Sequence, residues 1–339
     1  MKMSPRERLM ARLAGETVDR IPNLNIVMLF AAQFAGQRYG DFCRDYHVLV
    51  EGQLKTAEEF GIDILSTMSD PFRETNDYGV KISYAEDDLP RKMENLIEDS
   101  DEIAEKIHRW DPMSSVRMLD RIRAVESFKK LRGDEFPILG WVEGPWAEFA
   151  DLADISDAMV MLIDDPDAVE QGMDVITQQA IACAEAQIEA GADVIGMGDA
   201  ASSLISADMY REYVFPREKQ IVEAIHRAGG KVKLHICGNV DHIIADMIDT
   251  GSDIVDIDYM VDADRAISLA HGRCSISGNI NPTAVIFQGT EEDNREAVRW
   301  FVDHGDNRSI VSSGCEIPKM TPVGNVYAIA DEIRKLSCS

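Results

Sequence analysis

The stretch Arg227-Ala-Gly-Gly-Lys-Val-Lys-Leu-His-Ile-Cys237 contains the unit from which the fold can be predicted. Its two glycines follow a helical pattern and are typical of a helix end. The apolar run from Lys231 to Cys237 that comes next predicts a buried strand. The same order recurs at Glu189-Ala-Gly-Ala-Asp193 and at Asp249-Thr-Gly-Ser-Asp253. This repetition is typical of βα units around a parallel sheet.

Eight short β-rich runs occur along the chain, which is the number that a closed α/β barrel needs. We predict strands at residues 21–28, 63–69, 136–143, 193–198, 231–237, 253–259, 274–278 and 309–314. Helical periodicity is found between them at residues 165–190, 206–228, 240–250 and 293–304. We therefore expect an α/β fold, a TIM (β/α)8 barrel, with an N-terminal helical extension capped by Ser4 and with inserted helices and a hairpin.

An open, doubly wound sheet is the alternative architecture. Gly196-Met-Gly198-Asp-Ala-Ala201 follows a predicted strand and loosely fits a dinucleotide-binding pattern. No acidic residue is found at a strand end about 20 residues further on, as that pattern requires. The barrel is therefore favoured.

Composition limits the class of protein. With 339 residues, 45% of them hydrophobic, and no linker or low-complexity segment, the chain is expected to form one domain over residues 1–339. The N-terminal helix has no apolar signal core and no run reaches transmembrane length, so we expect a soluble, cytoplasmic protein without a membrane partner. The net charge of −27, from 61 acidic and 34 basic residues, argues against nucleic acid as a partner.

Three residues form a candidate metal site. His235 and Cys237 are two positions apart in a predicted strand, so both side chains project from the same face. Cys315 follows another predicted strand in Ser312-Ser-Gly-Cys-Glu-Ile-Pro318. One imidazole and two thiolates suit Zn²⁺, and three protein ligands leave a position for a substrate. Taken singly, each residue is more often an ordinary core residue, but all three lie where a strand meets a loop.

Further polar residues follow predicted strands. In a barrel, the carboxyl ends of the strands gather on the face that carries the active site. We therefore expect Asp70, Glu143, Asp199 and Asn279 to bind substrate, although ordinary polar loop residues are an equally frequent alternative. The six cysteines, at positions 43, 183, 237, 274, 315 and 338, are too irregular for a disulfide framework.

These residues make the chain resemble the uroporphyrinogen decarboxylase superfamily. The resemblance runs from Arg6-Glu-Arg-Leu-Met-Ala-Arg-Leu-Ala-Gly-Glu-Thr-Val-Asp-Arg-Ile-Pro22 to Gly314-Cys-Glu-Ile-Pro-Lys-Met-Thr-Pro322. Within it, the chain is similar to the methylcobamide:coenzyme M methyltransferase branch. The resemblance implies a TIM barrel enzyme in which His235, Cys237 and Cys315 bind zinc. Asp258, 23 positions after His235, is the candidate for a fourth, displaceable ligand.

The resemblance also implies a reaction and its partners. A small thiol such as coenzyme M, bound as a zinc thiolate, would exchange a methyl group with a methylated corrinoid, either methylcobalamin or a separate corrinoid protein. A separate partner is expected because the chain lacks the Asp-X-His-X-X-Gly pattern of corrinoid-binding modules. The sequence leaves the thiol, the direction of methyl flow and a homodimer open.

The decarboxylase branch is the main alternative. True decarboxylases are expected to carry an arginine-rich loop after the first strand, which would hold the carboxylates of a tetrapyrrole. Residues 23–36 of this chain contain no basic residue. A corrinoid methyltransferase with another methyl donor or acceptor, and a non-catalytic corrinoid- or metal-binding module, are further alternatives.

Overall fold

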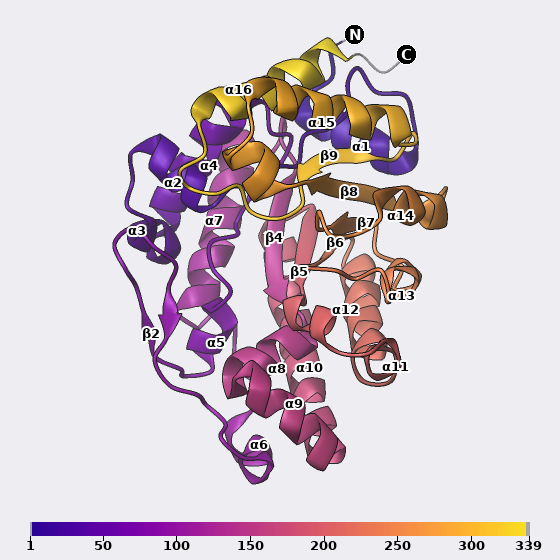
Figure 1. Cartoon of the computed structure of the whole chain (residues 1–339). Coiled ribbons are helices and arrows are strands. Elements are labelled where there is room, and N and C mark those ends of the chain that lie inside the picture. Colours follow the sequence, from indigo (N-terminus) through magenta and orange to yellow (C-terminus); the bar gives the residue numbers. More distant parts are fainter. Residues whose placement is uncertain (1, 337–339) are drawn as a thin grey trace.

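A curved parallel sheet forms the centre of the computed structural model, which describes residues 2–336 (Figure 1). Its seven strands are hydrogen-bonded in the order β1-β4-β5-β6-β7-β8-β9, and every pair is parallel. The strands are β1 Leu65–Ser66, β4 Ile138–Glu143, β5 Val194–Gly198, β6 Lys231–Ile236, β7 Ile254–Ile257, β8 Ser275–Ile280 and β9 Ile310–Ser313. Each lies within or beside a predicted strand, and the α/β barrel is confirmed.

The prediction of a regular strand at residues 21–28 is wrong. Only Asn23 forms a bridge, which pairs it with Val311 of β9. On one side the backbone N–H of Leu24 donates to the carbonyl oxygen of Val311 at 2.9 Å, and on the other the N–H of Asp63 donates to that of Asn23 at 2.8 Å. The segment thus lies between β9 and the start of β1, in the eighth position of the barrel.

Side chains and a proline explain why this segment is not a regular strand. Pro22 has no N–H to donate to a ladder. The backbone N–H of Asn23 donates to Oδ2 of Asp63 at 2.8 Å, and that of Asn25 donates to Oδ1 of Asn23 at 3.1 Å. These backbone N–H groups therefore donate to side-chain oxygens instead of to the backbone carbonyl groups of a neighbouring strand.

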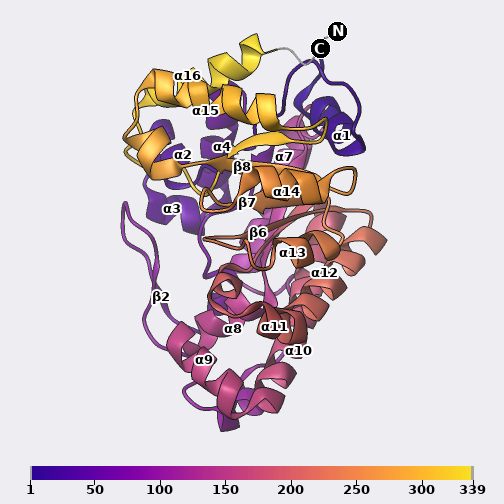
Figure 2. The ribbon, with the colours of Figure 1, turned by 45° about the vertical axis from the view of Figure 1, so that its right-hand side comes forward.

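Helices cover the outer face of the sheet (Figures 1 and 2). Three long helices, α7, α10 and α12, pack side by side against β4, β5 and β6. The helices are α1 Pro5–Ala14, α2 Leu29–Ala35, α3 Tyr39–Arg44, α4 Tyr46–Phe60, α5 Arg73–Asp77, α6 Ile103–Lys106, α7 Arg117–Arg132, α8 Pro145–Ala153, α9 Ile155–Asp164, α10 Pro166–Ala190, α11 Ala207–Met209, α12 Phe215–Arg227, α13 Ile244–Asp249, α14 Ala263–Ala270, α15 Glu291–His304 and α16 Val323–Lys335.

The predicted helices are present with small changes at their ends. The helix predicted at residues 165–190 is α10, Pro166–Ala190, and its C-cap Gly191 has φ 116°, a conformation that favours glycine. Helix α13 is shorter than the predicted 240–250, because the side chain of Asn239 accepts the N–H of Asp241 and holds a turn there. Among residues 2–336, no helix is both long and apolar enough to cross a membrane.

The expected extension and insertions are also present. Helix α1 begins with a capping box between Ser4 and Glu7, and it lies with α16 at the same end of the molecule (Figure 1). An antiparallel hairpin, β2 Ile82–Ser83 and β3 Arg91–Lys92, lies outside the barrel sheet. Cys183 and Cys274 are buried in the core, and Cys338 lies outside the described residues.

Candidate metal centre

Strands β6 and β9 bring the three predicted ligands together. His235 lies in β6 and Cys237 directly follows it, and His235 Nε2 is 3.0 Å from Cys237 Sγ. Cys315 comes two residues after β9, and its Sγ is 3.7 Å from that of Cys237. The donor atoms of all three residues lie within 4.8 Å of one another. This spacing is short enough for one metal ion to contact all three.

A buried ion pair orients the imidazole. Asp256 lies opposite His235 in the register of β6 and β7, and its Oδ2 is 2.9 Å from His235 Nδ1. The same oxygen is 2.6 Å from Nζ of Lys233, and both side chains are almost fully buried. Burial alone would raise the pKa of Asp256, but Lys233 and His235 lower it below its usual value. The carboxylate therefore holds Nδ1 and leaves Nε2 directed at the thiols.

A hydrogen bond links the two thiols, with 3.7 Å between their sulfur atoms. The hydrogen bond from Cys237 lowers the pKa of Cys315 to about 4, with a further contribution from His235. The same hydrogen bond and burial raise the pKa of Cys237 above its usual value. Burial would lower the pKa of His235, but Cys237 and Asp256 raise it. A lowered thiol pKa favours the thiolate form, which is the form that binds a metal ion.

Asp258 lies beside this cluster but is held by the backbone. Its Oδ2 accepts the N–H of Gly238 at 2.7 Å, and its Oδ1 accepts that of Tyr259 at 2.6 Å. Burial raises the pKa of its carboxyl group. Within residues 2–336, the group of side chains close enough to hold one metal ion contains His235, Cys237 and Cys315 without Asp258.

The cluster forms one wall of a cavity of about 160 Å³ at the carboxyl ends of the strands. Most of its other lining residues are apolar, and three carry carboxyl groups. The lining residues are Ile26, Met28, Met68, Ser69, Asp70, Pro71, Leu89, Trp141, Glu143, Gly198, Ala200, His235, Cys237, Cys315 and Glu316. Such a cavity, apolar with a few polar groups, is typical of a small-molecule site.

Trp141 and Glu143 of β4 form one side of the cavity. The indole Nε1 of Trp141 donates to Glu143 Oε1 at 2.9 Å. A Cβ at Gly198 would lie 2.7 Å from Cζ2 of this indole, so the glycine makes room for the tryptophan. The glycines of the alternative dinucleotide pattern thus have a packing role. Burial, followed by the nearby Glu74, raises the pKa of Glu143 well above its usual value.

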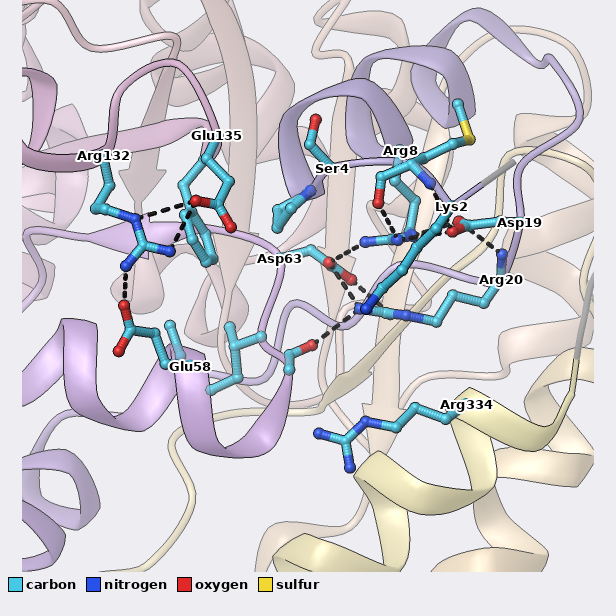
Figure 3. A pocket seen from close by; sticks show the side chains of 16 residues that line it. Lys2, Ser4, Arg8, Asp19, Arg20, Glu58, Asp63, Arg132, Glu135 and Arg334 are labelled. Atoms are coloured by element: carbon cyan, nitrogen blue, oxygen red, sulfur yellow. Dashed lines mark hydrogen bonds and ion pairs between the residues drawn. The ribbon is translucent and has the colours of Figure 1, made fainter.

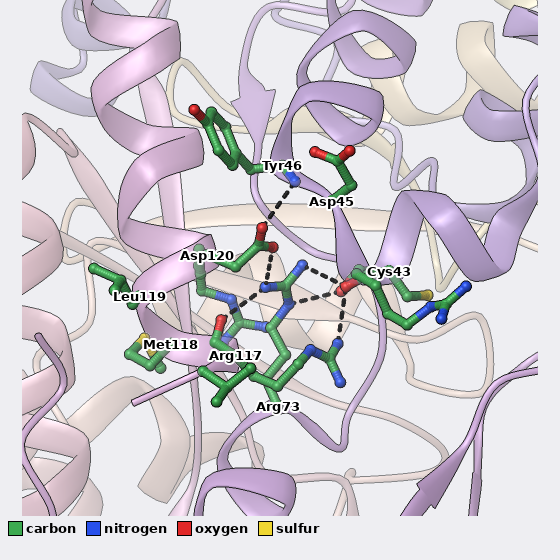
Figure 4. A network of polar contacts seen from close by, with 12 residues as sticks. Cys43, Asp45, Tyr46, Arg73, Arg117, Met118, Leu119 and Asp120 are labelled. Atoms are coloured by element: carbon green, nitrogen blue, oxygen red, sulfur yellow. Dashed lines mark hydrogen bonds and ion pairs between the residues drawn. The ribbon is translucent and has the colours of Figure 1, made fainter. Parts of the chain in front are cut away.

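Asp70 lines the cavity in front of buried arginines. Its Oδ2 is 2.7 Å from Nη2 of Arg117. Arg117 and Arg73 both donate to the carbonyl oxygen of Cys43 at 3.0 Å, and Arg73 also pairs with Asp120 at 2.9 Å (Figure 4). Burial would raise the pKa of Asp70, but Arg117 and Arg73 lower it. Asp70 is therefore an anion whose charge is already balanced.

Two predicted substrate-binding residues do not line this cavity. Asp199 turns toward the start of α8, where its Oδ1 accepts the N–H of Ala147 at 2.6 Å. The N-terminus of a helix attracts such a carboxylate, which explains the orientation. The side-chain amide of Asn279 donates to the carbonyl oxygen of Val261 at 3.2 Å. The end of a strand determines the backbone position of the next residue, but it does not determine the direction of its side chain.

Several residues of the site were not predicted. Glu316 lines the cavity, and its Oε1 accepts the N–H of Leu29 at 2.6 Å. Burial raises its pKa to about 8. Trp141 and Lys233 were also missed. One signal for Lys233 was available, because a lysine two positions before His235 in an apolar strand needs a buried partner.

A larger cavity of about 810 Å³ lies at the opposite, amino ends of the strands. Figure 3 shows that most of the labelled charges in it face one another, whereas Arg334 stands apart. Asp63 binds Arg8 at 2.6 Å and Arg20 at 2.7 Å, and Arg132 pairs with Glu58 and Glu135. No cluster of metal-binding groups was found there among residues 2–336. Within the described residues, the candidate metal-binding group therefore lies at the smaller cavity and not at this one.

Comparison with known proteins identifies the family of the chain. The profile of the family described as "Uroporphyrinogen decarboxylase (URO-D)" matches residues 4–336. The chain belongs to this family. It is 28% identical over 336 residues to the methylcobamide:CoM methyltransferase MtbA of Methanosarcina mazei, covering 97% of each chain. It is 22% identical over 305 residues to a uroporphyrinogen decarboxylase of Carboxydothermus hydrogenoformans, covering 88% of this chain and 85% of the relative.

Solved structures confirm the fold. A methyltransferase from Methanosarcina mazei superposes with a TM-score of 0.90 at 23% identity, covering 98% of this chain and 99% of that one. A B12-independent methionine synthase from Shewanella gives a TM-score of 0.58 at 15% identity, covering 86% of this chain and 88% of that one. The predicted resemblance to the family and to its methyltransferase branch is confirmed, and so is the prediction of an enzyme.

Proposed function

We propose that this enzyme moves a methyl group between a methylated corrinoid and a small thiol, and that His235, Cys237 and Cys315 hold a zinc ion for this purpose. The observation that carries the proposal is the convergence of one imidazole and two sulfur atoms within 4.8 Å at the wall of an apolar cavity. Relatives named methylcobamide:CoM methyltransferases, at 28% identity over nearly the full chain, support it.

The chemistry of the donor set fits zinc. The two sulfur atoms and the imidazole nitrogen form a soft set, and the Asp256 carboxylate behind His235 is the kind of partner that zinc-binding histidines have. Bound there, the ion would act as a Lewis acid that keeps a coordinated thiol deprotonated at neutral pH. Asp258, close to the cluster, would serve as a fourth ligand while its two backbone hydrogen bonds hold it in place, because each carboxylate oxygen keeps a free lone pair.

The residues of the chain would bind and orient the substrate. The thiol enters the cavity beside Cys315, and the apolar side chains of Met28, Met68 and Trp141 exclude water from it. The substrate thiol loses its proton to solvent. Its sulfur then attacks the methyl carbon, an S–C bond forms, the Co–C bond breaks, and the electron pair of that bond stays on cobalt as cob(I)amide. Alignment of the two reactants in the cavity would account for much of the acceleration.

The partners follow from this reaction. The methyl donor would be free methylcobalamin or a separate corrinoid protein that docks over the carboxyl ends of the strands. Coenzyme M is the thiol in the names of the relatives, and it is one candidate acceptor here. A cytoplasmic location and a homodimer remain predictions, which cell fractionation and light scattering would test.

Tetrapyrrole decarboxylation is the second candidate, because decarboxylases are also among the relatives. The lining of the cavity argues against it. Within residues 2–336, no lysine or arginine lines the cavity, whereas three carboxyl groups do. A substrate with many carboxylates needs cationic partners, preferably arginine.

A direct assay separates the two candidates. We expect the purified protein to convert methylcobalamin to cob(I)alamin under anaerobic conditions, only when a small thiol is added. It should leave uroporphyrinogen unchanged. A protein that decarboxylates uroporphyrinogen and gives no thiol-dependent cob(I)alamin would refute the proposal.

A further inference from the structure

We infer that the small thiol bound in this cavity carries a neutral or ammonium group rather than a sulfonate or carboxylate. This inference rests on the proposed function and names the class of its substrate. It comes from the charges around the sulfur cluster. Of the residues that line the cavity in the described part of the chain, Asp70, Glu143 and Glu316 carry carboxyl groups and none carries a basic side chain apart from His235.

Glu143 is the acid best placed to meet a ligand. It is 8% exposed and lines the cavity, and its Oε1 accepts the indole N–H of Trp141. Because the side chain lines the cavity, its other oxygen, Oε2, is available to a ligand. A ligand that donates a hydrogen bond or carries a positive charge would pair with it.

Glu316 supplies a second acid directly after Cys315. One of its oxygens accepts the N–H of Leu29, and the side chain borders the cavity. Glu143 and Glu316 both present carboxyl oxygens to the cavity, and neither adds positive charge to it. These oxygens can accept hydrogen bonds from a hydroxyl or an ammonium group of a ligand.

The basic residues nearby contact other groups. Arg117 stands behind Asp70 and binds it, and Lys233 binds Asp256 beneath His235. Lys92 lines a neighbouring cavity, where its Nζ donates to the backbone carbonyl oxygen of Asp151 at 2.6 Å. Within residues 2–336, no lysine or arginine lines the cavity itself.

The balance of charges then decides the class of thiol. A sulfonate moved into this cavity would lose its hydration and would find no lysine or arginine among the lining residues to pair with. A hydroxyl group would lose little, and an ammonium group would gain from the acids. The relatives named after coenzyme M act with a thiol that ends in a sulfonate, so this chain should differ from them in its acceptor.

Three thiols with the same two-carbon skeleton test the inference: cysteamine, 2-mercaptoethanol and 2-mercaptoethanesulfonate. With methylcobalamin as donor, we expect kcat/KM for the first two to exceed that for the sulfonate by at least about 10-fold, which corresponds to about 1.4 kcal/mol. Calorimetric binding of the three thiols to the zinc-loaded protein should show the same order. A sulfonate that binds and reacts as well as cysteamine would overturn the inference and leave the proposed function intact.

Failure of all three thiols as acceptors would instead count against the proposed function, and the order of binding would still decide the class of thiol.

Glu143→Gln and Glu316→Gln together should reduce the preference for cysteamine over 2-mercaptoethanol at least about 5-fold. Glu58→Gln, at the opposite end of the barrel, is the control and should leave this ratio unchanged. An unchanged ratio in the double variant would contradict the role of the two acids.

Discussion

The two ends of the barrel hold charged groups in opposite ways. At the amino ends of the strands, most charges in the larger cavity pair with one another, as Asp63 does with Arg8 and Arg20. At the carboxyl ends, the smaller cavity holds an imidazole, two thiols and three carboxyl groups. Paired charges stabilise a fold, whereas incompletely paired groups are available to a ligand. The candidate site is therefore chosen by the chemistry of its groups and not by the size of the cavity.

The largest effect is expected at the carboxyl end. Replacing Cys315 by Ala should reduce methyl transfer about 1,000-fold or more, because the several kcal/mol that a bound metal contributes would be lost. The far-UV circular dichroism spectrum should not change. Cys274→Ala, which removes a buried thiol near the start of β8, is the control. A folded Cys315→Ala protein with normal turnover would show that this thiol is not needed.

At the amino end, the expected effect is on stability. Asp63→Asn should lower the free energy of unfolding by about 3–5 kcal/mol, because it removes the fully buried carboxylate that pairs with both Arg8 and Arg20 and leaves Arg8 paired with Asp19. Urea denaturation measures this value. Glu58→Gln, which breaks an exposed pair, should change it by about 1 kcal/mol or less. Folded Asp63→Asn protein should retain its zinc. Loss of zinc would contradict the view that the amino ends of the strands contribute stability and the carboxyl ends bind the metal.

A smaller effect is expected behind the metal site. Asp256→Asn should weaken zinc binding about 10- to 100-fold, because the imidazole of His235 loses the carboxylate that orients it. Competition with a chelator measures this affinity. Asp253→Asn, just before the same strand and in contact with His226 and Lys231, is the matched control. Equal zinc affinity in the two variants would mean that Asp256 only neutralises Lys233.

The smallest effect concerns pH. Arg8 and the N–H of Met3 overcome the effect of burial and lower the pKa of Asp19 to about 2, from its usual value of 3.8. A carboxyl group whose pKa is lowered in the folded state stabilises the protein above its unfolded pKa. This contribution is lost as the pH falls from about 3.8 to about 2.

Urea denaturation at several pH values would test this effect. Wild type should be more stable than Asp19→Asn at pH 7, and the difference should shrink as the pH falls below about 4. A difference that stays constant down to pH 2 would show that the ion pair does not cause it.

The sequence was informative about the candidate site where the alternation of side chains along a strand determines their direction. His235 and Cys237 share a face because they are two positions apart in β6, and the glycine after α10 fixed where the next strand begins. The sequence was less informative where local hydrogen bonds decide. Asp199 turns to the start of α8 and does not line the cavity, and the regular strand expected at residues 21–28 is replaced by side-chain contacts. Pairing between strands, as for Lys233 and Asp256, depends on a register that one sequence does not reveal.

The central claim is that zinc bound by His235, Cys237 and Cys315 leaves a position open for the substrate thiol. X-ray absorption at the zinc edge tests it most directly, because it counts the sulfur atoms around the metal. For protein purified without added metal, we predict about one zinc per chain with two sulfur ligands, rising to three when the accepted thiol is added. Absence of zinc, or a sulfur count that stays at two with saturating thiol, would contradict the account.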